Sequence, residues 1–108
     1  MDDKQKTHKE FGEAVNMAPA EIEKWLDTDE SKKVGFKDSD GKESVGHQSG
    51  RRIIEIKRKA LKDISEADYE HMRKVIGYVH RHLAQRPRGD ITETPWRYSL
   101  MNWGHDPK

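Results

Sequence analysis

The chain has 108 residues and no cysteine, and it is 38% charged and 31% hydrophobic with a net charge of +1. This length suits one small domain and is too short for two that each bury a core, and the lack of cysteine excludes a disulfide framework and a thiolate metal site. Neither end carries a long apolar run, so we expect no signal peptide, no membrane association and a cytoplasmic location.

The two parts of the chain carry opposite net charges. Residues 1–46 contain eight lysines and no arginine against twelve acidic residues, a net charge of −4. Residues 47–108 contain thirteen basic residues against eight acidic ones, a net charge of +5, and they hold all eight arginines. Such an asymmetry is typical of a protein with a polyanionic partner.

Apolar periodicity predicts an all-α fold of about five helices in one domain. This domain is expected to span residues 8–108, after a flexible N-terminus at residues 1–7. The first helix is expected to end near Asn16 or Met17, and Pro19 suits the first turn of the second. Trp25 and Leu26 follow Ile22 by three and four residues, so the three side chains share the face that the second helix is expected to bury.

A stretch rich in Gly, Asp and Ser separates the second helix from the third. It runs from Asp27 to Gly46. We expect a loop of about twenty residues here, well beyond the usual length, which is typical of functional loops. A short hairpin around Asp40 and Gly41 is a weaker alternative.

Three further helices are expected in the second part of the chain. Ser49 is the predicted N-cap of the third, Ser65 with Asp68 forms a capping pair for the fourth, and Thr94 before Pro95 starts the fifth. The fourth is the clearest, because one apolar stripe runs along it to about Gln85. The stripe consists of Tyr69, Met72, Ile76, Val79 and Leu83. We expect the three tryptophans to pack in the core and residues 103–107 to fold back onto the body.

The start of the third helix is the first candidate site. Free amides at a helix start and two guanidiniums make a site for phosphate, which five residues would form: His47, Ser49, Gly50, Arg51 and Arg52. One alternative is ordinary capping by Ser49 with solvated arginines. Another is that the partner of this site is an acidic group from the first half of the same chain.

The exposed face of the fourth helix is the second candidate site. A turn of 100° per residue places Lys74, Tyr78 and Arg81 opposite the apolar stripe, and Arg86 extends this face. These residues would contact further phosphates or bases. The alternative is a solvated face on which Glu70 and Lys74 pair.

Metal binding and catalysis are not indicated. No two histidines have the i,i+4 spacing of a helical zinc site, no nucleophile motif follows a strand, and no carboxylates form an evident acid and base pair. We therefore expect no metal, no cofactor and no enzymatic activity. His80 is expected at the border of the core stripe, and the other histidines on the surface.

Two resemblances to known families bear on function. Residues 17–26 and 51–56, joined by the long loop, resemble the helix, extended loop, helix layout of SAP-like DNA-binding domains. Over nearly the whole chain, Glu43 to Ile53, His71 to Val75, Tyr78 to Gln85 and Leu100 to Pro107 are similar to the DUF3140 family of small bacterial and fungal proteins. Some members of that family are labelled DNA-binding, so the resemblance implies a nucleic-acid partner.

The sequence thus predicts a protein that binds DNA, expected to be double-stranded, through its phosphate backbone with little sequence preference. The other interpretation is a protein interaction module that meets an acidic protein partner or a second copy of itself, without nucleic acid.

Overall fold

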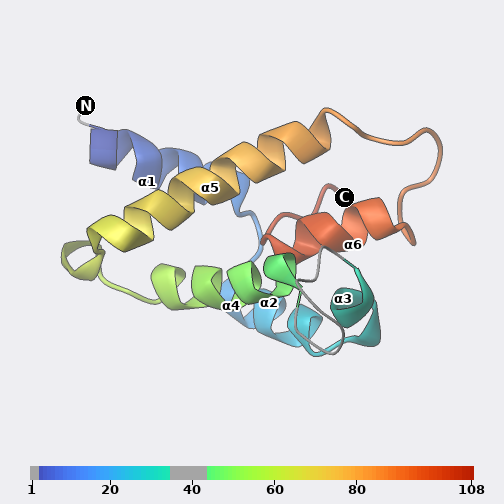
Figure 1. Ribbon diagram of the computed structural model, residues 1–108, viewed down its shortest axis with the longest axis horizontal. Helices are drawn as coiled ribbons and strands as arrows, with labels where there is room; N and C mark the ends of the chain where they lie inside the picture. Colours follow the sequence, from blue (N-terminus) through green and yellow to red (C-terminus); the bar gives the residue numbers. More distant parts are fainter. Residues whose placement is uncertain (1–2, 35–43) are drawn as a thin grey trace.

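The computed structural model describes residues 3–34 and 44–108, which form only helices and connecting segments (Figure 1). In chain order the helices are α1 (Asp3–Ala14), α2 (Pro19–Leu26), α3 (Asp29–Lys33), α4 (Val45–Lys57), a 3₁₀ helix (Leu61–Asp63), α5 (Glu66–Leu83) and α6 (Pro95–Asn102). The described residues contain no strand, so the predicted all-α class is confirmed.

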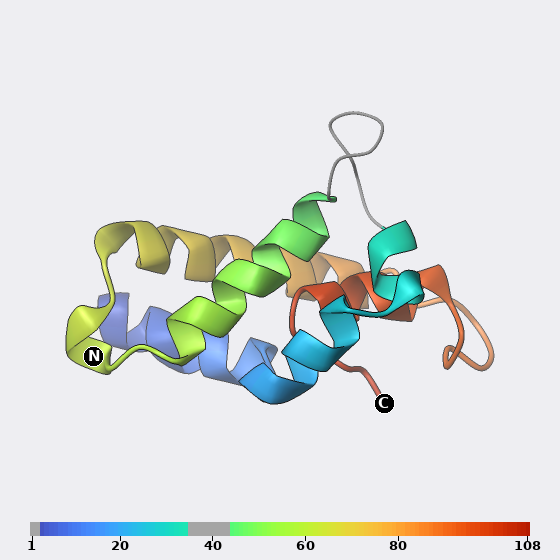
Figure 2. The ribbon, with the colours of Figure 1, turned by 90° about the horizontal axis from the view of Figure 1, so that it is seen from below.

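The helices form two packed pairs, which α6 joins, and α5 is the longest helix of the described residues. α1 lies along one side of α5, α2 packs against α4, and α6 lies between this second pair and α5 (Figures 1 and 2). Their apolar faces meet in a single hydrophobic cluster. Its most buried members are Val15, Ile22, Ile53, Ile56, Met72, Val75, Val79 and Leu100.

Helices α5 and α6 begin as their capping sequences predict. Ser65 and Asp68 form a capping box, in which the Ser65 hydroxyl accepts from the Asp68 amide and the Asp68 carboxylate accepts from the Ser65 amide. The Thr94 hydroxyl accepts from the Arg97 amide at the start of α6, and Pro95 occupies its first turn. Both predictions are confirmed.

Three differences from the predicted elements concern the first half and the middle of the chain. α1 already begins at Asp3, so residues 3–7 are helical, and Thr7 is buried. The predicted loop contains α3, whose N-cap Thr28 accepts from the Ser31 amide. The apolar face expected on the third helix includes Ala60 and Leu61, but α4 ends at Lys57, so Leu61 lies outside it and is exposed. The suggested hairpin at Asp40 and Gly41 lies outside the described residues.

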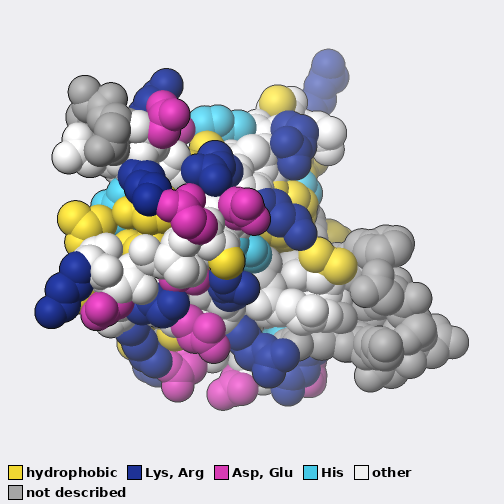
Figure 3. Space-filling model, turned by 60° about the vertical axis from the view of Figure 1, so that its left-hand side comes forward, with side chains coloured by type: hydrophobic (Ala, Val, Ile, Leu, Met, Phe, Trp, Pro, Cys, Tyr) yellow, Lys and Arg dark blue, Asp and Glu magenta, His cyan; other side chains and the backbone are white. Residues whose placement is uncertain are grey.

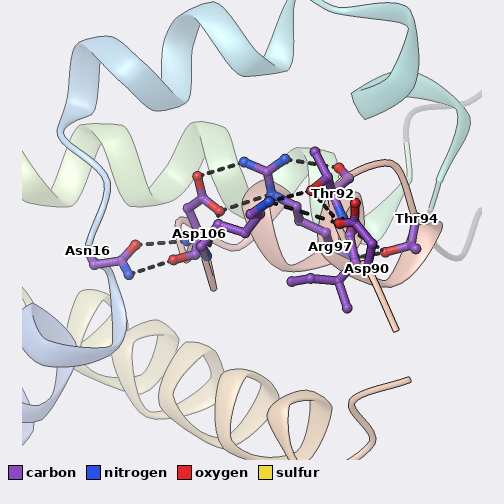
Figure 4. Close-up of polar contacts among 8 residues, drawn as sticks. Asn16, Asp90, Thr92, Thr94, Arg97 and Asp106 are labelled. Atoms are coloured by element: carbon purple, nitrogen blue, oxygen red, sulfur yellow. Dashed lines mark hydrogen bonds and ion pairs between the residues drawn. The ribbon is translucent and has the colours of Figure 1, made fainter. Parts of the chain in front are cut away.

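The C-terminal segment folds back onto the body, as predicted. The Arg97 guanidinium donates two hydrogen bonds to the Asp106 carboxylate, both of 3.0 Å, and a third of 2.9 Å to the Thr92 carbonyl (Figure 4). Asn16 exchanges two hydrogen bonds with the Asp106 backbone, and His105 Nδ1 donates to the Ala14 carbonyl. These contacts join the C-terminal segment to the connection between α1 and α2 and to α6.

Candidate functional site

The predicted phosphate site at the start of the third helix does not form. The helix begins at Val45, and Ser44 is its N-cap, accepting from the His47 amide at 3.1 Å. The amides of residues 49–52 therefore lie inside α4, where helical carbonyls accept their hydrogen bonds. The prediction that Ser49 caps this helix is wrong, because an earlier serine does so.

Residues of this segment hold helices together instead. His47 is buried, and its Nε2 donates to the Leu26 carbonyl at 2.7 Å. The Ser49 hydroxyl is also buried and is hydrogen-bonded to His71 Nε2 at 2.9 Å. A Cβ on Gly50 would lie 2.6 Å from the Asn102 carbonyl oxygen, so glycine is needed for α6 to approach α4 this closely.

The two adjacent arginines of α4 point to different surroundings. Arg51 lines a groove between α2 and α4 that also contains three acidic side chains, Glu23, Asp27 and Glu55. Arg52 forms an ion pair with Asp68 at 3.1 Å on the other side of the helix. They do not converge on one anion site.

Several cations are neutralised by local carboxylates. Arg58 pairs with Glu23 at 2.9 Å, Arg97 with Asp106 at 3.0 Å, and Lys59 with Asp68 at 2.6 Å. Figure 3 views the end of the molecule where α4 ends and α5 begins, and basic and acidic side chains are interspersed there. This face therefore offers no continuous field of one sign.

The buried carboxylate of Asp68 is the centre of this pairing. A hydrogen bond from Lys59 lowers its pKa far below the usual range, and the Ser65 amide and Arg52 add to this shift against the opposing effect of burial. Asp68 is thus ionised at neutral pH and compensates Arg52 and Lys59.

A different set of cations has no such partners. Residues 71–89 contain five basic residues and no acidic one. We call these five the α5 cationic face: Arg73, Lys74, Arg81, Arg86 and Arg88. All are exposed, and none forms an ion pair with a carboxylate of the described chain.

Helix geometry gathers the α5 cationic face. Arg73, Lys74 and Arg81 fall within an arc of about 100° around α5. Arg86 and Arg88 follow just beyond the helix, and the Arg86 guanidinium lies over the Trp96 ring, 5.7 Å from its centroid. Glu70 forms no ion pair with Lys74 among the described residues, so the predicted i,i+4 pair is absent.

A cavity of about 300 Å³ lies where α4, α5 and α6 meet. Its lining consists of Val45 and Gly46 from α4, Lys74, Tyr78 and Arg81 from α5, and Ser99, Asn102 and Trp103 from α6 and its C-cap. The structure thus brings together three residues that the sequence placed on one helix face, Lys74, Tyr78 and Arg81. No carboxylate is among the lining residues.

The two aromatic residues that line this cavity, Tyr78 and Trp103, belong to a series of nearly parallel stacked rings. The ring centroids of Trp103 and Tyr78 are 4.2 Å apart, Tyr78 and His82 are 5.2 Å apart, and His82 and Trp96 are 5.5 Å apart. His71 continues the series beyond Trp103 at 6.4 Å. The His82 ring donates to the Trp96 carbonyl, and the Trp96 indole donates to the His82 carbonyl. α5 and α6 are therefore joined by interleaved rings.

The histidines differ from their predicted places. His80, expected at the border of the core stripe, is exposed, whereas His47 is buried. His71, His82 and His105 are half-buried, and His8 lies on the surface as predicted. Burial lowers the pKa of His71, and the charges of Arg52 and Lys74 lower it further. Burial also raises the pKa of Tyr78, opposed by a hydrogen bond with Ser99. Both side chains are therefore uncharged at neutral pH.

Asn102 is a structural residue of the cavity. Its side-chain oxygen accepts from the Trp25 indole at 2.7 Å and from the Ser31 hydroxyl, and its amide group donates to the Ser31 carbonyl at 3.1 Å. Because these contacts fix Asn102 among α2, α3 and α6, the free polar groups of the cavity come from its other residues.

The described residues contain neither a metal-binding cluster nor a membrane-spanning helix. No group of three or more His, Asp or Glu side chains there could hold a metal ion. Within the same ranges, no helix combines the length and apolar character needed to cross a membrane.

Comparisons with known proteins place the chain in a family. No curated protein and no solved structure matches it. A family model described as "Protein of unknown function (DUF3140)" matches residues 10–101, a range that includes the α5 cationic face and the cavity residues up to Ser99. The chain therefore belongs to the DUF3140 family, as its sequence resemblance predicted.

Proposed function

We propose that the protein binds double-stranded DNA through the phosphate backbone, using the α5 cationic face. The observation that carries this proposal is the acid-free stretch 71–89, whose five cations make no ion pair with described carboxylates. By contrast, Arg52, Arg58 and Arg97 each pair with a carboxylate. Clustered unpaired cations repel one another, and a polyanion relieves this repulsion.

The chemistry of this face suits phosphate rather than base recognition. Four of its five members are arginines, whose planar guanidiniums bind phosphate oxygens in pairs. Arg73 and Arg81 are eight residues apart, about 12 Å along the helix, so one helix can contact more than one phosphate. Residues 71–83 include no Asn or Gln, the side chains that pair with adenine, so sequence preference is expected to be low.

Charge removal outside the cavity tests the proposal. The triple variant Arg73→Gln, Arg86→Gln and Arg88→Gln is compared with the wild type by fluorescence anisotropy on two unrelated duplexes at several salt concentrations. We expect affinity to fall about tenfold or more at low salt, and the slope of log K against log salt to flatten by about 0.9 for each phosphate that the variant no longer neutralises.

The matched control removes three lysines from other helices, Lys9, Lys24 and Lys33, each replaced by Gln. All three are exposed, so the net charge changes equally while the α5 cationic face is kept. An equal decrease of affinity in both variants would show that net charge alone determines DNA affinity, and this would contradict the proposal. Absence of wild-type binding at low salt would also contradict it, and a mass that rises with concentration in light scattering would then favour self-association.

A further inference from the structure

The cavity between α4, α5 and α6 offers cations and hydrogen-bond donors without a compensating carboxylate. Lys74 and Arg81 line it from α5, and neither pairs with a described acidic residue. Val45 and Gly46 line it from the first turn of α4, where amides have no acceptor within the helix. The same helix end carries the positive pole of the helix dipole.

The Trp103 indole N–H is a second, independent feature of the cavity. Trp25 donates its indole N–H to Asn102 and Trp96 donates to the His82 carbonyl, whereas that of Trp103 has no acceptor in the described chain. Trp103 is only 4% exposed. No fully buried side-chain nitrogen or oxygen of the described residues lacks a partner, so this N–H must be reached by solvent, and the cavity that Trp103 lines gives that access.

Gly46 keeps the indole N–H uncovered. A Cβ at this position would lie 2.9 Å from Trp103 Nε1 and 3.5 Å from Cδ1. Any other residue would therefore cover the donor or push the ring aside, so glycine at position 46 is required for an open N–H.

We propose that this cavity binds the terminal phosphate of a phosphomonoester. A phosphomonoester carries nearly two negative charges and three strong acceptor oxygens, which match two cations, the indole N–H and the start of a helix. A carboxylate has one charge and two oxygens, so it would leave part of this donor set unused. The volume of about 300 Å³ is at the small end of ligand sites and holds the phosphate with part of the attached group.

The ligand has two sources that share this chemistry, a free nucleoside monophosphate and the phosphorylated end of a nucleic-acid strand. The inference does not rest on the proposed function, because the continuous backbone of a duplex contains diesters and no terminal phosphate. Lys74 and Arg81 belong to both surfaces, whereas Arg73, Arg86 and Arg88 lie outside the cavity.

Titration with deoxyadenosine monophosphate, followed by ¹H–¹⁵N NMR, tests the inference. We expect saturable shifts of the Trp103 indole N–H and the Gly46 amide, with smaller changes at the Trp25 and Trp96 indoles. Deoxyadenosine, which lacks the phosphate, is expected to leave all of them in place. Equal shifts with both compounds, or none with the monophosphate, would overturn the proposal.

Variants separate the cavity from the surrounding surface. The double variant Lys74→Gln and Arg81→Gln is expected to bind the monophosphate about tenfold more weakly or worse, since hydrogen bonds to charged groups are the strong ones. Arg73→Gln, which removes a neighbouring charge outside the cavity, is the control and should bind as the wild type does. Gly46→Ala, with folding checked by circular dichroism, should also lose binding. Equal weakening by Arg73→Gln would contradict a defined site.

Two single-stranded oligonucleotides distinguish the sources. Tighter binding of the 5′-phosphorylated strand than of its 5′-hydroxyl counterpart supports recognition of strand ends. Equal binding of the two strands, together with saturable binding of the monophosphate, supports a free nucleotide as the ligand. Duplex binding by the α5 cationic face is measured separately. If the protein binds duplex DNA but not the monophosphate, this inference alone is contradicted. If it binds the monophosphate but not duplex DNA, the proposed function alone is contradicted.

Discussion

Replacing Gly50 with alanine is expected to destabilise the protein by about 3 kcal/mol. The new Cβ would lie 2.6 Å from the Asn102 carbonyl oxygen and 2.9 Å from Leu26 Cδ2. The oxygen belongs to the backbone of α6, which cannot turn away as a flexible side chain can. The mutation therefore forces α4 and α6 apart, and the cavity between them is expected to change with it. Urea unfolding measures the decrease in stability.

Gly12→Ala is the matched control for this prediction. Gly12 also lies in a helix, but no atom lies within 4 Å of the position that its Cβ would take. Alanine has the higher helix propensity, so we expect a gain of about 0.5–1 kcal/mol. If Gly50→Ala were as stable as Gly12→Ala, the close packing of α4 on α6 would be wrong.

Replacing Asp68 with asparagine is expected to cost about 2–3 kcal/mol at neutral pH. Asp68 is buried and accepts hydrogen bonds from Arg52, Lys59 and the Ser65 amide. Asparagine has one acceptor oxygen in place of two and carries no charge, so both cations lose their partner and the capping box is weakened. The exposed residue Asp63 provides the control, because Asp63→Asn is expected to change stability by no more than about 0.5 kcal/mol.

The pH dependence of stability gives the same prediction a second measurement. The pKa of Asp68 is lowered in the folded state, so the unfolded state binds a proton first as the pH falls below the ordinary value of 3.8. The stabilisation by Asp68 is therefore present above that pH and is lost below it. We expect the wild type to lose more stability than Asp68→Asn between pH 5 and pH 2. An equal decrease in both proteins would show that Asp68 is not the group responsible.

Helices α5 and α6 could be predicted from the sequence because local signals agree in both. In α5 the apolar stripe, the Ser65 cap and the Asp68 partner all indicate the same start and the same buried face. In α6 Thr94 and Pro95 do so. Thr28, followed by two acidic residues and then two lysines, is an equally good local signal for α3, but the surrounding Gly, Asp and Ser residues favoured a loop.

The start of α4 could not be predicted from local signals alone. Ser44 and Ser49 are both good N-cap residues, and glycine is a poor helix former, so the segment between them reads as a loop. Tertiary packing decides the outcome, because Gly46 and Gly50 are four residues apart on the side that meets Trp103 and Asn102. Glycines with this spacing could have indicated a close helix contact.

The candidate site was predictable only in the part that one helix supplies. The turn of 100° per residue placed Lys74, Tyr78 and Arg81 together, and the structure brings them to one cavity. Trp103 and Gly46 come from other helices, so their approach to these residues depends on tertiary packing. His71, Tyr78 and His82 lie seven and four residues apart on α5, a spacing that could have indicated the ring series.

NMR titration of the protein with duplex DNA tests most directly whether the α5 cationic face is the nucleic-acid contact. At low salt we expect the backbone amides of the α5 cationic face and of Gly77 to shift together, and the shifts to shrink as salt is added. Shifts confined to the groove beside Arg51, or none at any salt concentration, would contradict the account.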